Sequence, residues 1–350
     1  MKSMYQKLRT LKWNPPAGWL RISTVDMHTG GEPLRILVDG YPEVKGETIL
    51  EKRKYFRDNL DHIRKGLMWE PRGHADMYGA VLTQACSGGA DFGTFFLHNE
   101  GYSTMCGHAI IALTKFVLDT GLVEKEGDSP QLIIDAPPGQ IISFGHREKG
   151  AVGSVSFKNV PSFVLHKDQQ VEVPGLGLVP YDVAFGGAFY AIVDADKLNL
   201  SLEPSEVNGL IEAGRQIKKR VIETQKVDHP FEPDLSFLYG TIFTGKPLCS
   251  SSDSRNVCIF ANGEVDRSAT GSGVSARAAL HHARGELQVD ELMVIESILG
   301  TTMEVQITEL VTFGPHKAVI PKVKGKASFT GKNSFWFDPE DPLSGGFIIR

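Results

Sequence analysis

The chain has 350 residues, of which 41% are hydrophobic and 23% are charged, with 37 Lys and Arg against 42 Asp and Glu. This composition is typical of a globular protein of about two domains and argues against disorder. A formal net charge of −5 gives no overall attraction for nucleic acid or an anionic membrane. No apolar run approaches the ~20 residues that span a bilayer, and the basic N-terminus lacks the apolar stretch of a secretory signal.

The four cysteines, Cys86, Cys106, Cys249 and Cys258, form no C-x-x-C pair. This argues against a disulfide scaffold and against a zinc site. The histidines likewise lack metal-ligand spacing, so no metal is expected. We therefore expect a reduced, cytoplasmic, enzyme-sized protein in which a cysteine with a function acts as a thiol.

The first part of the chain is expected to be rich in strands around two helices. Residues 1–19, which include Pro15-Pro16, read as a poorly ordered lead-in. Residues 47–66 have the apolar spacing of an amphipathic helix, and the apolar run 106–118 predicts a buried helix. Alternating or short apolar segments predict strands at 20–27, 34–38, 80–84, 93–97, 132–135, 140–143, 154–157 and 171–173.

The second part of the chain is also expected to be rich in strands around two helices. Residues 181–193 predict two strands joined by a Gly-Gly turn, and residues 203–225 predict a second charged amphipathic helix. Residues 270–283 predict a helix of small residues. Further strands are expected at 256–261, 303–307, 317–320, 326–329 and 334–337.

A short internal sequence similarity suggests that the two parts are related. The segment CGHAIIA at 106–112 aligns with TGSGVSA at 270–276, about half the chain length away. A match this short arises easily by chance. However, each copy opens an expected helix after strand-rich sequence, as a duplicated domain would.

Cys106 is the sharpest candidate for chemistry, because it stands at an expected helix start just before Gly107-His108. The free amides and dipole of a helix N-terminus favour a thiolate and can hold a substrate carboxylate. A buried structural cysteine is the competing interpretation. Thr270 precedes a Gly/Ser-rich helix start that could cradle an anion, or it could simply be the N-cap of that helix. Asp266 could be helix-start charge or the partner of a substrate ammonium.

Four segments together resemble the proline racemase superfamily: MHTGGEP at 27–33, PRGH at 71–74, MCGH at 105–108 and DRSATGSG at 266–273. The resemblance runs in order from about residue 21 to the C-terminus. It implies an α/β (α+β) fold of two pseudo-symmetric halves of the diaminopimelate-epimerase type, with the active site in the cleft between them. It also implies that no cofactor or metal is used. We expect a lead-in at 1–19, a first half at 20–183 plus 338–350, and a second half at 184–337.

Racemases and 4-hydroxyproline epimerases of that family present one cysteine to each face of the substrate Cα, but this chain has Thr270 where the second should stand. A threonine hydroxyl is too weak an acid and base to exchange a Cα proton near neutral pH. The Cys/Thr pair resembles the family members that dehydrate trans-3-hydroxy-L-proline to Δ1-pyrroline-2-carboxylate. In that substrate the Cα hydrogen and the C3 hydroxyl share one ring face, so a single acid/base group suffices.

The resemblance implies catalytic roles for Cys106, as the base, and for Thr270. It implies substrate binding by Gly107, His108, Asp266, Gly271 and Ser272. Epimerase or racemase activity with another second base stays open as an alternative, as does an amino-acid-binding protein without catalysis. The expected partner is a hydroxyproline substrate, with neither nucleic acid nor membrane, and a homodimer is possible.

Overall fold

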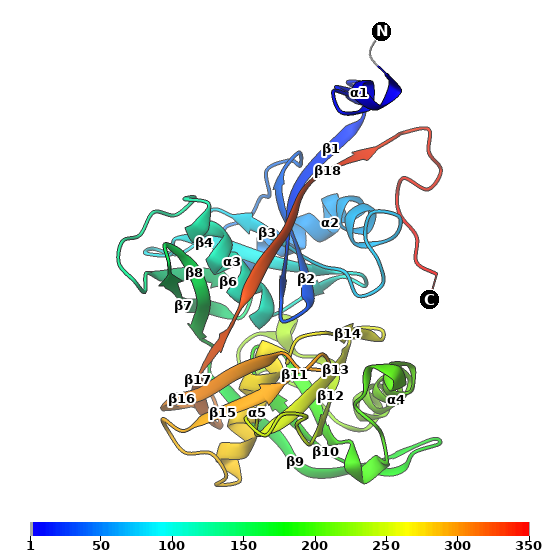
Figure 1. Ribbon diagram of the computed structural model, residues 1–350. Helices are drawn as coiled ribbons and strands as arrows, with labels where there is room; N and C mark the ends of the chain where they lie inside the picture. The colour runs from blue at the N-terminus through cyan, green and yellow to red at the C-terminus, as the bar shows by residue number, and fades with distance from the viewer. Residues whose placement is uncertain (1–2, 350) are drawn as a thin grey trace.

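Two halves of similar build form the molecule, each a strongly curved sheet around one buried helix (Figure 1). The structure is a computed structural model that describes residues 3–349, so residues 1, 2 and 350 of the expected end segments lie outside the described residues. Hydrogen bonds join the strands of both halves into one continuous sheet. This arrangement confirms the expected α/β class and its two pseudo-symmetric halves.

The elements follow the expected order with few differences. The first half contains β1 (Leu20–Thr29), β2 (Glu32–Asp39), α2 (Ile49–Met68), β3 (Tyr78–Thr83), β4 (Phe92–His98), β5 (Tyr102–Ser103), α3 (Gly107–Asp119), β6 (Gln131–Ala136), β7 (Gly139–Glu148) and β8 (Ala151–Lys158). The second half contains β9 (Ser162–Val173), β10 (Gly177–Phe185), β11 (Phe189–Asp194), α4 (Val207–Thr224), β12 (Leu238–Gly245), β13 (Ser254–Phe260), β14 (Glu264–Asp266), α5 (Gly271–Ala283), β15 (Leu292–Glu296), β16 (Thr302–Phe313) and β17 (His316–Gly325). Three of the second-half strands, β12, β14 and β15, were not expected from the sequence.

The two central helices are buried because they offer no polar face to water. Nearly every residue of α3 is buried, and α3 contacts β1, β7, β8 and β18 (Ala327–Phe337). The helix α5, built largely of small residues, is enclosed in the same way by β9, β10, β16 and β17. By contrast α2 and α4 are amphipathic and lie on the outside of their halves (Figure 1).

The strand β18 (Ala327–Phe337) returns from the second half to the first, where it pairs antiparallel with β1 along its whole length (Figure 1). The two strands expected at 326–329 and 334–337 are therefore one. The strand β9 falls within the expected first half, but it pairs with β10 and β17, which belong to the second half. We accordingly propose a boundary near residue 160 instead of the expected 184, with 327–337 assigned to the first half.

The lead-in contains a short helix that was not expected, α1 (Met4–Leu8). Its first turn is closed by a capping box, in which Ser3 and Gln6 each accept a hydrogen bond from the other's backbone N–H. Farther along, the Trp13 ring packs edge-on against Trp336 of β18, with ring centroids 5.2 Å apart. This segment is thus anchored to the β1–β18 ribbon.

The N-termini of α3 and α5 meet at the centre of the molecule, at Gly107 and Gly271. A Cβ atom built on Gly107 would lie 2.7 Å from the Gly271 Cα, and one built on Gly271 would lie 2.8 Å from the Gly107 Cα. Real Cβ atoms do not approach backbone so closely, so both positions require glycine. The two similar segments, 106–112 and 270–276, contain the two helix starts that are in contact here.

Gly107→Ala is expected to destabilise the protein by about 1–3 kcal/mol, because the added methyl group must push two backbones apart. A matched control is Gly209→Ala in α4, where a Cβ meets no atom within 4 Å. That substitution should raise stability by about 0.5–1 kcal/mol through the helix preference of alanine. Urea denaturation measures both, and equal effects of the two substitutions would contradict the close contact.

Candidate active site

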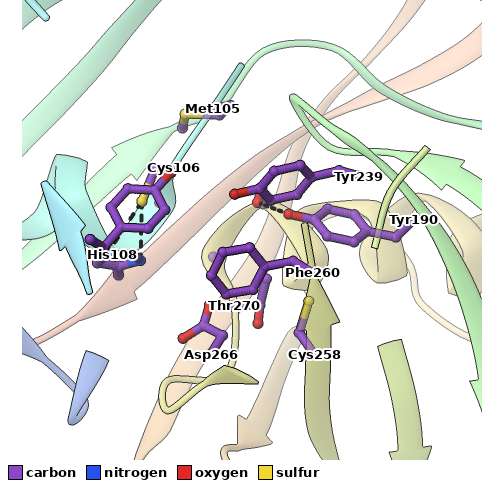
Figure 2. Close-up of a pocket in the computed structure, with 13 residues that line it drawn as sticks. Met105, Cys106, His108, Tyr190, Tyr239, Cys258, Phe260, Asp266 and Thr270 are labelled. Carbon is purple, nitrogen blue, oxygen red and sulfur yellow. Dashed lines mark hydrogen bonds between the residues drawn. The ribbon is translucent and has the colours of Figure 1, made fainter. Parts of the chain in front are cut away.

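A small cavity lies between the two helix N-termini, with about 280 Å³ not occupied by protein atoms (Figure 2). The structure brings every site residue expected from the sequence to the wall of this cavity: Cys106, Gly107, His108, Asp266, Thr270, Gly271 and Ser272. Three come from the first half and four from the second. The cavity therefore exists only when both halves are in contact.

Cys106 is the N-cap residue of α3, and its side chain caps the helix. The Ala109 N–H donates a hydrogen bond to the Cys106 Sγ over 3.4 Å. Burial raises the pKa of the Cys106 thiol well above its usual range, and the Ala109 N–H partly offsets this rise. The interpretation of Cys106 as a structural cysteine is weakened by its place at the cavity wall, where its sulfur faces other polar groups.

His108 holds its ring beside that sulfur, with Nδ1 3.0 Å from the Cys106 Sγ. Burial lowers the pKa of His108 to about 3, although a hydrogen bond to the Pro33 carbonyl opposes the change. The imidazole is therefore neutral at pH 7. Since one ring nitrogen donates to Pro33, the other can accept a hydrogen bond from the Cys106 thiol.

Thr270 occupies the matching position before α5, but it does not cap the helix with its side chain. Its φ of 65° lies in the left-handed region, which is rare for a β-branched residue and typical of functional sites. Within the described chain its buried Oγ1 has no hydrogen-bond partner. The N-cap interpretation of Thr270 is therefore wrong in the sense of side-chain capping, and the hydroxyl is available to a ligand.

The electrostatics of the cavity suit a zwitterion. The first amides of α3 and α5 have no acceptors within their helices and carry the positive ends of two helix dipoles, so they favour a carboxylate. Asp266, which is 5% exposed, supplies the opposite charge. Burial raises the pKa of Asp266 to about 6, and hydrogen bonds from Ser268 limit the rise. A ligand ammonium beside this carboxylate would compensate the buried charge.

Arg267 ties the second half to the first directly behind Asp266. Its guanidinium pairs with Asp76 at 2.8 Å, and its backbone N–H donates to the Glu32 Oε2 over 2.7 Å. Glu32 is fully buried, and both burial and the charge of Asp266 raise its pKa. Glu32 begins β2 directly after the loop that follows β1, and Asp76 lies in the loop before β3. Through Arg267 these two loops join the two halves.

Other conspicuous residues of those loops have structural roles. Asp26 forms a buried ion pair with Arg35 at 2.9 Å, inside the first half. Arg72 donates hydrogen bonds to the carbonyls of Trp336 and Ser344 and so fastens the C-terminal segment. These residues lie apart from the wall of the cavity.

Sequence reasoning missed the aromatic wall of the cavity. Tyr78, Tyr190, Tyr239 and Phe260 line it, as does Cys258, which was expected to be packing filler. Cys258 and Phe260 could have been found, because alternate residues of a strand share a face and both lie just before Asp266 on one hairpin. Tyr190 and Tyr239 come from strands with no local signal of function.

Three further findings concern the described part of the chain. All four cysteines are free, with Cys106 and Cys258 buried and the other two exposed. Across residues 3–349 there is no group of three or more His, Cys, Asp or Glu side chains placed to hold a metal ion. None of the helices described is long and apolar enough to cross a membrane.

The arrangement can bind a small zwitterion between a thiol on one side and a hydroxyl on the other. Figure 2 shows Cys106 and His108 on one side of the cavity and Thr270 with Cys258 on the other. An amino acid held by the helix amides and Asp266 would present its Cα between them. The two helix starts thus offer one thiol, on Cys106, and one hydroxyl, on Thr270, and a hydroxyl is too weak an acid and base for proton transfer at Cα near neutral pH.

Comparison with known proteins identifies the family of the chain. A family model described as proline racemase matches residues 24–348. The chain is 50% identical to a trans-3-hydroxy-L-proline dehydratase of Colwellia psychrerythraea, over 97% of this chain and 96% of that protein. It is 46% identical to the human trans-3-hydroxy-L-proline dehydratase, over 94% and 95%.

Solved structures give the same fold. A hydroxyproline epimerase from Agrobacterium vitis, crystallised with bound trans-4-hydroxy-L-proline, matches with a TM-score of 0.88 and 28% identity over 97% of each chain. A probable proline racemase from Agrobacterium radiobacter matches with the same TM-score and identity, over 94% of this chain and 96% of that one. These matches and the family model lead to one conclusion: this chain belongs to the proline racemase family.

Proposed function

We propose that this protein is a hydro-lyase that dehydrates trans-3-hydroxy-L-proline to Δ1-pyrroline-2-carboxylate. The observation that carries the proposal is the unequal pair at the two helix starts, where Cys106 faces the cavity from α3 and Thr270 from α5. The relatives named as dehydratases of this substrate, at 50% and 46% identity over nearly the whole chain, support it.

In this proposal the substrate binds as a zwitterion. Its carboxylate accepts hydrogen bonds from the amides of Gly107, His108, Gly271 and Ser272, which also stabilise negative charge that develops during proton removal. Its ring ammonium pairs with Asp266. The protonated nitrogen withdraws electrons from Cα and so makes the Cα proton easier to remove.

Cys106 is the base in the first step. Its thiol, which lies 3.0 Å from the neutral His108 ring, loses its proton to solvent, and the thiolate then removes the Cα proton. The ammonium of the bound substrate lowers the thiol pKa that burial has raised. Substrate binding therefore favours the reactive form of Cys106.

Loss of water follows on the same ring face. The C3–O bond breaks, the electrons of the former Cα–H bond form the Cα=C3 double bond, and the departing oxygen takes the proton from the Cys106 thiol. The products are water and an enamine, which tautomerises to the cyclic imine. Cys106 ends as the thiolate that began the cycle.

A second candidate function is 4-hydroxyproline epimerase or proline racemase activity, which the two structural matches at 28% identity favour. It needs a second base on the Thr270 side of the cavity. Cys258 is the residue with a suitable group there, but it lies on the strand β13 and not at a helix start, where Cys106 receives a hydrogen bond from the Ala109 N–H. A binding protein without catalysis is less well supported, because Cys106 stands beside His108 at the cavity wall.

The proposal retains two expectations about the protein in the cell. Four free thiols in the described residues support a reduced, cytoplasmic setting. A homodimer is carried over as an expectation from the family resemblance. Neither expectation changes the chemistry of the cavity.

Cys106→Ser should lower kcat for dehydration at least 1000-fold, because a serine hydroxyl cannot act as the base near neutral pH. Imine formation from trans-3-hydroxy-L-proline, followed by NMR, measures the effect. Cys86→Ser is the control, since Cys86 is exposed and lies away from the cavity. Substantial dehydration by the Cys106→Ser variant would contradict the assignment of Cys106 as the base.

Thr270→Cys should add a second acid/base group and with it epimerase chemistry. We expect D-proline to form from L-proline, with solvent deuterium at Cα, where the unmodified protein forms none. Chiral chromatography and NMR in D2O measure this. If the unmodified protein already inverts proline, and Cys258→Ala removes that activity, the second candidate function is correct instead.

The pH profile of kcat/KM should report the ionisation of Asp266 and of Cys106. Asp266, with its pKa raised to about 6, is ionised above that pH, so kcat/KM should fall about tenfold per pH unit below it. The raised pKa of Cys106 means that kcat/KM should also rise with pH and continue to rise above the usual thiol range. Asp266→Asn should remove the acidic limb. An acidic limb that survives in Asp266→Asn would mean that another group controls it.

A further inference from the structure

The hydroxyl of Tyr239 differs from the other two tyrosine hydroxyls at the cavity. Tyr78 shares a short hydrogen bond with Ser103, and the Tyr190 hydroxyl lies 2.7 Å from the Ser272 Oγ. Tyr239 is 6% exposed, and in the described structure its buried hydroxyl forms no hydrogen bond of good geometry, although a longer contact with the Tyr78 side chain lowers its pKa slightly. An unpaired buried hydroxyl is costly, so natural proteins rarely keep one without a ligand or another use for it.

The ring of Tyr239 is held in place by its neighbours. It stacks on Phe260 with ring centroids 5.4 Å apart and an interplanar angle of 26°. It also meets the edge of Tyr190 at 5.9 Å and the edge of His98 at 6.0 Å. Packing therefore sets the direction of the hydroxyl, and a phenylalanine at this position would keep the same contacts.

The position of the hydroxyl matches one atom of the proposed substrate. Figure 2 shows Tyr239 and Asp266 on opposite sides of the cavity, with the Tyr239 hydroxyl end directed toward the side of Cys106. In proline Cα is bonded to the ring nitrogen and to C3. If the nitrogen lies toward Asp266 and the carboxylate toward the helix starts, C3 lies away from Asp266. A C3 hydroxyl on the Cys106 face then points toward Tyr239.

We propose that the Tyr239 hydroxyl donates a hydrogen bond to the C3 oxygen of the substrate, which selects a 3-hydroxylated proline and stabilises that oxygen as it departs. This inference rests on the proposed function. Burial raises the pKa of Tyr239 well above its usual range, so the phenol keeps its proton throughout. The departing hydroxide takes its proton from the Cys106 thiol, and one water leaves for each substrate consumed.

The test compares two ligands that differ only in the C3 hydroxyl. Calorimetry on Cys106→Ser protein, which does not turn over, measures the affinities for trans-3-hydroxy-L-proline and L-proline, with and without Tyr239→Phe. We expect Tyr239→Phe to weaken binding of the hydroxylated ligand about tenfold and to leave L-proline within about twofold. Tyr190→Phe is the matched control and should weaken both ligands equally, because the Tyr190 hydroxyl contacts Ser272.

A separate measurement avoids any dependence on the folding of the variant. The unmodified protein should bind cis-3-hydroxy-L-proline, whose hydroxyl lies on the other ring face, no more tightly than L-proline. Equal losses of both ligands in Tyr239→Phe, or preference for the cis isomer, would overturn the role of Tyr239. Failure of the unmodified protein to form the imine from trans-3-hydroxy-L-proline would instead overturn the proposed function, and the binding comparison would still decide the contact.

Discussion

The structure depends on the contact of two helix N-termini at Gly107 and Gly271. Each helix start carries unpaired amides and roughly half a positive charge, so bringing two together is unfavourable without a negative group nearby. The contact becomes possible because neither residue has a Cβ, and it creates a place where an anion is strongly favoured. The curved sheets around α3 and α5 serve to hold these two ends in position.

The polar bridge behind the cavity keeps the halves together. Arg267 of the second half meets Asp76 and Glu32 of the first, and their burial removes water from the adjoining site. The same burial raises the pKa of Cys106 and Asp266 and keeps His108 neutral. A zwitterionic ligand brings a carboxylate to the helix ends and an ammonium to Asp266, so it supplies the charges that the closed site lacks.

The two halves share a design but differ in the residue at each helix start. The Cys106 side chain accepts a hydrogen bond from its own helix, whereas Thr270 adopts a left-handed backbone and leaves its hydroxyl unpaired. The Cys106 side is thereby suited to proton transfer, and the Thr270 hydroxyl is suited only to hydrogen bonding with the ligand. An elimination that uses a single ring face is compatible with this asymmetry, while inversion at Cα would need a second base on the Thr270 side.

The sequence by itself determined the four long helices, most strands and the site motifs, because these depend on local periodicity and on residues close together in the chain. It did not reveal the short helix α1 or the strands β12, β14 and β15. It also did not reveal the return of β18 to β1, because a buried strand lacks alternation and its partner is set by distant residues. Only the tertiary structure decided that Tyr239 and Cys258 line the cavity and that Glu32 and Asp76 hold Arg267. The physical reason is that long-range strand pairing brings these side chains together, and no local pattern records it.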